Sequence, residues 1–169
     1  MRSESKIKGL EELKAIVAAL KAEGKRIVFT NGCFDLLHVG HVAYLEEARS
    51  YGDVLIVGLN SDASVKRIKG PQRPIMPEWA RARMLAALWA VDYVVVFEEE
   101  TPLRVIRELK PHVLVKGGDW KEEQVIGREL VEEVKITPYL EGFSTTALVR
   151  KIKGLPMETS EEFLAGKDQ

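Results

Sequence analysis

The sequence predicts an α/β fold, in which a parallel five-stranded sheet carries helices on both faces and one extra helix lies at the N-terminus. Two observations support this fold class. Short β-rich segments alternate with segments of helical periodicity along the chain, and this order is typical of a parallel sheet. The segment at residues 54–59 is apolar at nearly every position, as expected for a strand buried on both faces. We therefore expect a Rossmann-like domain.

The first third of the chain contains a helix, a strand and a second helix. Apolar residues between positions 10 and 20 recur at helical spacing, and Gly24 is a suitable stop signal. Residues 26–31 form a β-rich run, which predicts the first strand. A glycine-containing loop follows, and it leads to a helix near residues 39–51.

The middle of the chain continues the alternation. After the second strand at residues 54–59, the segment 61–76 is basic and contains proline, which favours a long loop with some helix. Residues 77–90 read as a helix with a proline in its first turn. Residues 93–97 (YVVVF) predict the third strand.

The last part adds two strands and two helices. A Thr-Pro pair opens a helix at residues 101–109, with the threonine as its N-cap. Strands are expected at residues 112–116 and 134–137, and Ser144 caps a last helix that runs to Ile152. These elements predict one domain over residues 1–154, with its extra helix within residues 1–24. Residues 155–169 read as a C-terminal tail.

The composition excludes several classes of protein. Hydrophobic residues make up 46% of the 169 residues, which is enough for a core, and the net charge of −1 argues against a general nucleic-acid binder. Cys33 is the single cysteine, so neither an internal disulfide framework nor a Cys-x-x-Cys zinc pair can form. The charged N-terminus is neither a signal peptide nor a membrane span. We therefore expect a cytoplasmic protein that binds neither nucleic acid nor membranes.

Four unusual segments each follow directly on a predicted strand. They are NGCFDLLHVGH, the basic stretch at residues 66–73, KGGDW and EGFSTT. Ligands of an open parallel sheet bind outside the carboxyl ends of its strands, so the four segments should meet at one edge. Their convergence predicts a ligand site there.

The histidine-containing segment is the most informative of the four. His38 and His41 are three residues apart at a strand-to-helix turn, where they share a face, and Gly40 lets the backbone approach a ligand. Helix N-terminal amides favour an anion, and two imidazoles add donors, so the arrangement suits a polyphosphate. Asp35 could bond the backbone of the loop. A metal site of Cys33, His38 and His41 is the rival interpretation.

The other segments have two interpretations each. The basic stretch is either a solvated charged loop or a phosphate contact through Lys66 and Lys69, and Arg81 lies in the helix after it. KGGDW places Lys116 beside two glycines, which forms either a turn or a site. The STT sequence is either a simple N-cap or a phosphate cradle.

Together these segments resemble a known family. GCFDLLHVGH resembles the (H/T)xGH signature of the nucleotidyltransferase superfamily, and GFSTT resembles its second signature. The phrases TNGCFDLLHVGH, GLNSDASVKRIKGPQRP, AVDYVVVFEEETP and LVKGGDW resemble, in this order, the adenylyltransferase domain of the bifunctional bacterial heptose kinase/adenylyltransferase. The resemblance covers residues 26–152.

The resemblance implies transfer of AMP from ATP to D-glycero-β-D-manno-heptose 1-phosphate, giving ADP-heptose, a precursor of the lipopolysaccharide core. It implies Mg²⁺ bound with ATP, a homodimer, and a separate heptose kinase. The implied catalytic residues are His38, His41 and Lys69. The implied nucleotide contacts are Gly32, Cys33, Phe34, Gly40, Lys66, Arg81, Lys116, Gly117, Ser144, Thr145 and Thr146, and the implied acceptor contacts are Asp35, Asp119 and Trp120.

Other activities fit the same motifs. Glycerol-phosphate cytidylyltransferases tend to have arginine where this sequence has Tyr139, which counts against that activity. A nucleotidyltransferase for another phosphorylated acceptor, of the glycerol 3-phosphate or FMN type, remains an alternative. A non-catalytic nucleotide sensor is a third.

Overall fold

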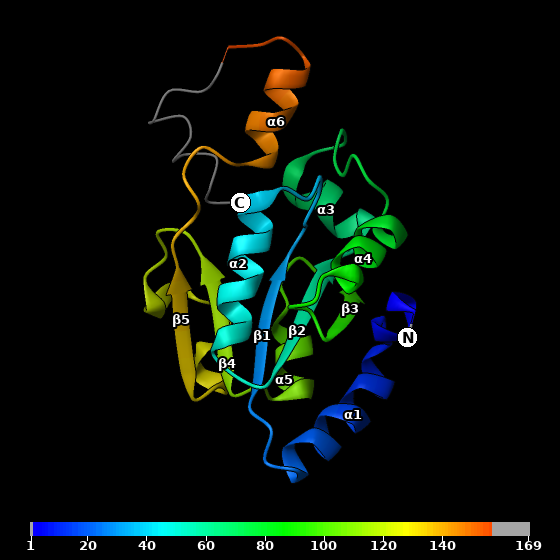
Figure 1. Ribbon diagram of the computed structural model, residues 1–169, viewed down its shortest axis with the longest axis vertical. Coiled ribbons are helices and arrows are strands. Elements are labelled where there is room, and N and C mark those ends of the chain that lie inside the picture. The colour runs from blue at the N-terminus through cyan, green and yellow to red at the C-terminus, as the bar shows by residue number, and fades with distance from the viewer. Residues whose placement is uncertain (1, 157–169) are drawn as a thin grey trace.

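A single parallel sheet organises the molecule. The computed structural model describes residues 2–156, and in this range five strands pair in the order β3-β2-β1-β4-β5 (Figure 1). The strands are β1 (Ile27–Gly32), β2 (Val54–Asn60), β3 (Tyr93–Phe97), β4 (Val113–Gly117) and β5 (Glu133–Thr137). Every pairing is parallel. The predicted fold class is confirmed.

Helices cover both faces of the sheet. The α-helices are α1 (Leu10–Ala22), α2 (Val39–Ser50), α3 (Asp62–Lys69), α4 (Glu78–Ala87), α5 (Leu103–Leu109) and α6 (Thr145–Ile152). Short 3₁₀ turns are η1 (Ser3–Lys6), η2 (Glu122–Gln124) and η3 (Arg128–Leu130). Residues of α2 and α4 pack on one face, and residues of α1 and α5 pack on the other. The expected N-terminal helix is α1.

The core consists of two apolar layers, one on each side of the sheet. Successive residues of β1 alternate between them, since Val28 belongs to the α2 and α4 layer whereas Ile27 and Phe29 belong to the α1 and α5 layer. All seven residues of β2 are buried, because this strand has a paired neighbour on each side and helices on both faces.

The order of the strands fixes the place of the site. Strand β1 lies between β2 and β4, and the connections after β1 and β3 run on opposite faces through α2 and α5. Loops at such a reversal separate and leave a crevice outside the carboxyl ends of the strands. The loops after β1, β2, β4 and β5 all lie at this end (Figure 1).

The segment at residues 61–76 contains a helix and a loop, as expected, but the sequence did not give the extent of the helix. Residues 62–69 form α3, whose first turn is capped by the Ser61 side chain accepting from the Ser64 amide. The segment is polar, so it lacks the apolar periodicity by which a helix is recognised. Two other helices are shorter than expected: α4 ends at Ala87, and α5 begins at Leu103 with Pro102 as its N-cap.

Helix α6 projects from the body of the molecule, and none of its residues is buried (Figure 1). Gly154 adopts a positive φ of 69° just after it, as its expected stop. Among the described residues, no helix is long and apolar enough to cross a bilayer. Most of the expected tail, residues 157–169, lies outside the described residues.

Candidate active site

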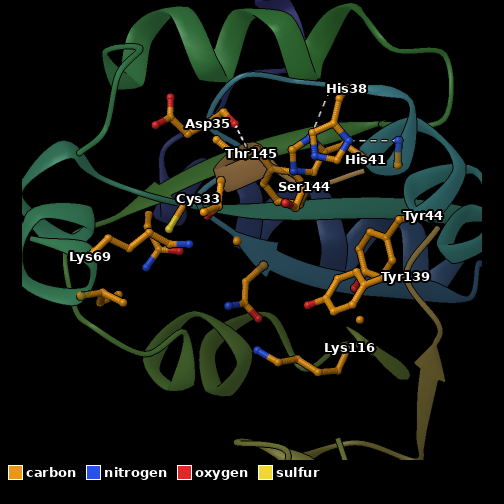
Figure 2. Close-up of a pocket in the computed structure, with 18 of the residues that line it drawn as sticks. Cys33, Asp35, His38, His41, Tyr44, Lys69, Lys116, Tyr139, Ser144 and Thr145 are labelled. Atoms are coloured by element: carbon orange, nitrogen blue, oxygen red, sulfur yellow. Dashed lines mark hydrogen bonds between the residues drawn. The ribbon is translucent and has the colours of Figure 1, made fainter. Parts of the chain in front are cut away.

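A cavity of about 470 Å³ lies at the carboxyl ends of the strands (Figure 2). Its size is that of a site for a small molecule or cofactor. All four segments singled out in the sequence contribute to it. Of the predicted site residues, it is lined by Gly32, Cys33, Phe34, Asp35, His38, Gly40, His41, Lys69, Lys116, Gly117, Trp120, Ser144, Thr145 and Thr146. The predicted convergence is therefore present in the structure.

The loop after β1 fixes the two histidines. His38 is the N-cap of α2, and its Nδ1 accepts a hydrogen bond from the Gly40 amide at 3.1 Å. The His41 Nδ1 accepts from the His38 amide at 3.2 Å, and the two rings stack with centroids 3.8 Å apart. At Gly40, an added Cβ would lie 2.9 Å from the His38 ring and 3.3 Å from the Phe143 side chain. Glycine is therefore required at this position.

These hydrogen bonds determine which ring nitrogen carries the proton. Each Nδ1 is an acceptor, so each neutral ring bears its hydrogen on Nε2 and can donate it. Burial lowers the pKa of His41 to about 3, helped by the neighbouring His38 and Lys69. Burial also lowers the pKa of His38. At neutral pH the site therefore presents two uncharged imidazoles as N–H donors to the cavity.

Asp35 holds the loop before α4 against the loop after β1. Its carboxylate accepts from the amides of Ile75 at 2.7 Å and Met76 at 3.0 Å, and it pairs with the Arg73 guanidinium at 2.9 Å. Burial opposes ionisation, but these donors outweigh it and hold the pKa of Asp35 below its usual range. Its contacts match the expected backbone role, and they occupy both carboxylate oxygens.

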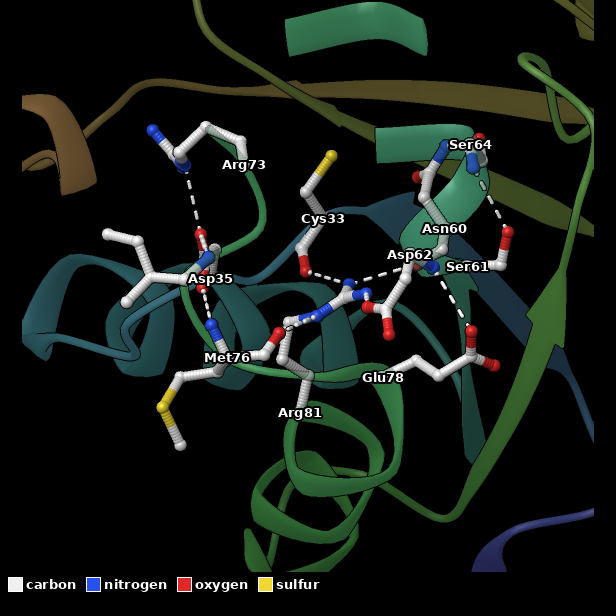
Figure 3. Close-up of polar contacts among 11 residues, drawn as sticks. Cys33, Asp35, Asn60, Ser61, Asp62, Ser64, Arg73, Met76, Glu78 and Arg81 are labelled. Carbon is white, nitrogen blue, oxygen red and sulfur yellow. Dashed lines mark hydrogen bonds and ion pairs between the residues drawn. The ribbon is translucent and has the colours of Figure 1, made fainter. Parts of the chain in front are cut away.

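Arg81 is not where the sequence suggested. We expected it to contact the nucleotide, but only 1% of the residue is exposed and it does not line the cavity. Its guanidinium donates to three backbone carbonyls and one carboxylate (Figure 3). These partners are Cys33 O at 2.7 Å, Asn60 O at 2.8 Å, Met76 O at 2.9 Å and Asp62 Oδ1 at 2.7 Å. Arg81 therefore joins the ends of β1 and β2 to α4 from beneath the cavity.

The lysines divide into those at the cavity and those outside it. Lys69 and Lys116 line different walls (Figure 2). The Lys116 ammonium lies 4.8 Å from the centre of the Trp120 ring, and burial lowers its pKa. Lys66 is exposed on α3 and does not line the cavity, and the exposed Asp119 does not either. The structure thus does not bring Lys66, Arg81 or Asp119 into the site.

The start of α6 closes the site opposite β1. The Ser144 side chain accepts from the Ala147 amide at 3.0 Å, so this serine is a cap. The Thr145 hydroxyl donates to the Asp35 carbonyl at 2.6 Å and links α6 to the loop after β1. Thr146 is exposed at the cavity, where its hydroxyl is open to a ligand.

Several lining residues were not predicted as site residues. They are Asn31, Tyr44, Asn60, Ile68, Arg73, Glu100, Thr101, Tyr139, Leu140 and Phe143. The Tyr44 hydroxyl lies 2.7 Å from that of Thr30 and donates to the Val115 carbonyl at 3.0 Å. Tyr139 packs on the Gly117-Gly118 bend, where a Cβ at Gly118 would lie 2.4 Å from its ring. Tyr139 carried a signal as a departure from a motif. Asn31, Ile68, Arg73 and Phe143 lie within the segments singled out in the sequence, but nothing marked them individually.

Comparison with known families agrees with this geometry. The sequence model of the cytidylyltransferase-like family matches residues 29–154, from within β1 to the second residue after α6. This chain belongs to the cytidylyltransferase-like family. The match includes the loop with His38 and His41, the segments with Lys69 and Lys116, and the start of α6.

Two similar curated proteins have the same name. "Bifunctional protein HldE" of Geotalea uraniireducens is 58% identical over 155 residues, which cover 89% of this chain and 32% of the relative. The protein of the same name from Aliarcobacter butzleri is 57% identical over 151 residues, with 89% and 32% covered. The chain therefore spans about a third of the length of these relatives.

Solved structures show the same architecture. The lipopolysaccharide core biosynthesis protein from Thermoplasma volcanium is 30% identical, with a TM-score of 0.58 over 69% of this chain and 98% of that chain. The pantoate-beta-alanine ligase from Francisella tularensis has the same TM-score at 16% identity, over 87% and 76% of the two chains. The second likeness shows the fold alone.

The rival metal interpretation finds no support in the cytidylyltransferase-like site. Among residues 2–156, no three His, Cys, Asp or Glu side chains are grouped so that they could hold a metal ion. Both histidines also use Nδ1 to accept backbone amides. Burial raises the pKa of the Cys33 thiol, against the positive charges of Lys69, Arg81 and Arg73, which disfavours a thiolate ligand.

Proposed function

We propose that this cytidylyltransferase-like domain transfers AMP from ATP to D-glycero-β-D-manno-heptose 1-phosphate, with release of pyrophosphate. The observation that supports it best is the locked pair of neutral imidazoles beside a helix N-terminus, since it offers fixed donors to a polyphosphate. The choice of acceptor rests on the family-specific phrases in the sequence and on the relatives named HldE.

The proposed reaction needs no covalent intermediate. A phosphate oxygen of the sugar 1-phosphate attacks the α-phosphorus of ATP, an O–P bond forms, and the bond to the β-phosphate oxygen breaks. Pyrophosphate leaves with the bonding electron pair, and no proton has to move in this step. Such transfers demand positioning and charge stabilisation rather than a nucleophilic side chain. Cys33, with its raised pKa, has no covalent role.

Lys69 and Lys116, on different sides of the cavity, would neutralise the negative charge of the phosphates. His38 and His41 face the cavity between Lys69 and Lys116 (Figure 2). Lys69, at the end of α3, would stabilise charge that develops on the transferred phosphate and the leaving group. Thr146 and the first amides of α6 add donors at the third side of the same space.

Magnesium fits this site as part of the nucleotide complex. Within the described residues, no carboxylate cluster forms a cage, and the Asp35 carboxylate is occupied by Arg73 and two amides. Mg²⁺ keeps several waters and binds largely through substrate phosphates, so such a cage is not required. When bound, it would neutralise phosphate charge.

The two walls suggest which end of the cavity takes each substrate. Trp120 and Tyr139 lie on the β4 and β5 side with Lys116, and their rings offer faces for a planar base. Asn60, Lys69 and Thr101 lie on the β2 and β3 side and offer polar groups. We therefore place adenine against the first wall and the sugar against the second. This moves Trp120 from the acceptor to the nucleotide.

Three wider expectations belong to the same proposal. A homodimer, a heptose kinase that supplies the acceptor and a cytoplasmic location follow from the resemblance. Static light scattering measures the first directly.

A pyrophosphate-release assay tests the reaction. With ATP and Mg²⁺, the β-anomer of the heptose 1-phosphate should turn over far faster than glycerol 3-phosphate, phosphocholine or FMN. A site built to bond the ring hydroxyls of the sugar can reject an acceptor that does not place hydroxyls at those positions by ~10⁴-fold. CTP should replace ATP poorly. Rapid turnover of CTP with glycerol 3-phosphate would contradict the acceptor assignment. ATP binding without pyrophosphate release would favour a sensor.

A further inference from the structure

The side chain of Asn60 lies on the wall assigned to the acceptor, but no partner has been given to it so far. Asn60 is the last residue of β2 and lines the cavity, although only 3% of it is exposed. Its backbone carbonyl accepts from Arg81 at 2.8 Å, so its position is fixed. The polar atoms of a buried amide beside a ligand cavity are hydrogen-bonded either by the protein or by the ligand. The contacts of Asn60 distinguish the two cases.

Ser64 fixes the orientation of the Asn60 amide. The Ser64 hydroxyl lies 2.7 Å from the Glu99 carbonyl, which can only accept, so the hydroxyl hydrogen points there. At 3.0 Å from Asn60, the same oxygen must then accept, which places the Asn60 Nδ2 toward Ser64. The side chain stands between Ser64 and Cys33 (Figure 3). Its Oδ1 is therefore directed away from Ser64.

The Asn60 Oδ1 opens onto the cavity without a donor. Among the described residues, none donates to it, and the unpaired side-chain atoms that are fully buried are Glu99 Oε2 and Thr137 Oγ1. Because Oδ1 is not one of these, it must be reached from the cavity. A carbonyl oxygen held in one orientation favours a ligand that places a hydrogen-bond donor there. A ligand without such a donor binds more weakly, because the oxygen is left without a hydrogen bond.

We propose that Asn60 Oδ1 accepts a hydrogen bond from a hydroxyl group of the phosphorylated acceptor, and that Asn60 is a specificity-determining residue. The inference rests on the proposed function for the identity of the substrates. The acceptor is favoured over the ribose because β1 separates β2 from the wall of β4 that carries Lys116 and Trp120. Lys69 and Thr101 line the same side.

The Asn60→Ala variant tests this contact. Losing one hydrogen bond to a buried substrate hydroxyl should lower kcat/KM for the heptose 1-phosphate by roughly tenfold to a hundredfold. The KM for ATP should stay within about twofold. Monodeoxy analogues of the sugar phosphate, each lacking one hydroxyl, identify the partner. The wild type should have a low kcat/KM for one of these analogues. Asn60→Ala should use that analogue as well as it uses the complete sugar phosphate, because the contact is already lost.

Two other variants separate the contact from general damage. Ser64→Ala removes the partner that holds the Asn60 amide. It should give a smaller loss of kcat/KM with the heptose 1-phosphate and no loss with the deoxy analogue that lacks the partner hydroxyl. Ser50→Ala, an exposed serine at the end of α2, should leave every constant unchanged. ATP affinity, measured by calorimetry, reports whether each variant is folded.

The outcomes distinguish this inference from the proposed function. Additive effects of Asn60→Ala and every deoxy analogue would overturn the hydroxyl contact, as would an equal rise of the KM for ATP and for the acceptor. If the wild type uses glycerol 3-phosphate and no sugar phosphate, the proposed function fails. The Asn60→Ala comparison is then made with glycerol 3-phosphate, and equal kcat/KM for the two proteins overturns the inference as well.

Discussion

The two ring nitrogens of His41 have different tasks. Its Nδ1 accepts the His38 amide and so belongs to the cap of α2, whereas its Nε2–H is available to the cavity. Simple removal of the ring would disturb both. Substitutions that keep one nitrogen's role and lose the other are therefore more informative than alanine.

His41→Asn and His41→Gln form such a pair. Asn keeps an acceptor attached to Cγ, as Nδ1 is, but has nothing at the place of Nε2–H; Gln carries an amide donor near Nε2 and loses the nearer acceptor. His41→Asn should lower kcat by roughly 10²–10³-fold with little loss of stability, as for other preorganised donors. His41→Gln should retain more activity and lose about 1 kcal/mol of stability. Steady-state kinetics and urea denaturation measure both.

The reverse pattern would show that His41 acts through the helix cap. His41→Asn activity within about threefold of wild type, which is under ~1 kcal/mol of barrier, would remove its Nε2–H from the mechanism.

At the scale of single residues, the sequence identified the motifs of the site more reliably than the function of each residue in it. His38, Gly40 and His41 were found because a glycine between two histidines after a strand has a physical meaning on its own. Arg81 was misplaced, because a buried arginine looks like any other helical arginine until the carbonyls around it are known. Asn60 was missed because its orientation depends on Ser64 and on the Glu99 carbonyl in the loop after β3.

At the level of elements, Arg81 is the junction between β1, β2 and α4. Its guanidinium donates to the carbonyls of Cys33, Asn60 and Met76, so these three segments meet through one side chain. Asp35 makes a second junction, from the loop after β1 to Arg73 and the backbone before α4. The cavity floor is thus a set of polar cross-links rather than apolar packing.

Replacing Arg81 should therefore destabilise the whole domain. Arg81→Met leaves three carbonyls without their donor and Asp62 without its partner, and should lower the free energy of unfolding by about 3 kcal/mol. Arg83→Met on the same helix is the matched control. Its side chain is 45% exposed and bonds Ser3 and Glu4, so a change below ~1 kcal/mol is expected. Equal changes in urea denaturation would contradict the role given to Arg81.

The elements that the sequence predicted well are those with a strong apolar pattern. Strand β2 was recognisable as a nearly continuous apolar run, and helix α1 by apolar residues at helical spacing. Helix α3 was not, because only Ser64 and Val65 of its eight residues are buried and its remaining pattern is charged. Its Ser61 cap was a local signal for the helix, but caps of this kind also occur in turns.

For the molecule as a whole, the buried histidines predict how stability depends on pH. The folded-state pKa of His41 is about 3, below its ordinary value of 6.5, so between these values the unfolded chain binds a proton that the folded chain does not. Stability is therefore present above pH 6.5 and is lost as the pH falls. One such proton contributes up to about 1.4 kcal/mol per pH unit. The lowered pKa of His38 acts in the same direction.

Urea denaturation between pH 4.5 and 7 measures this loss. The lower bound stays above the usual 3.8 of Asp35, whose depressed pKa would add its own loss in stronger acid. His41→Asn should show a shallower decline than the wild type over this range. Parallel curves for the two proteins would mean that His41 titrates normally in the folded state.

The bond from the Thr145 hydroxyl to the Asp35 carbonyl joins residues that are 110 positions apart. During synthesis, all five strands leave the ribosome before α6 does, and α6 adds no buried residue to the core. A nascent chain can thus assemble its sheet while the side of the cavity that α6 contributes is still missing. On the proposed function, the domain can bind ATP fully only after α6 has formed, so a translation product interrupted before α6 would be folded but inactive.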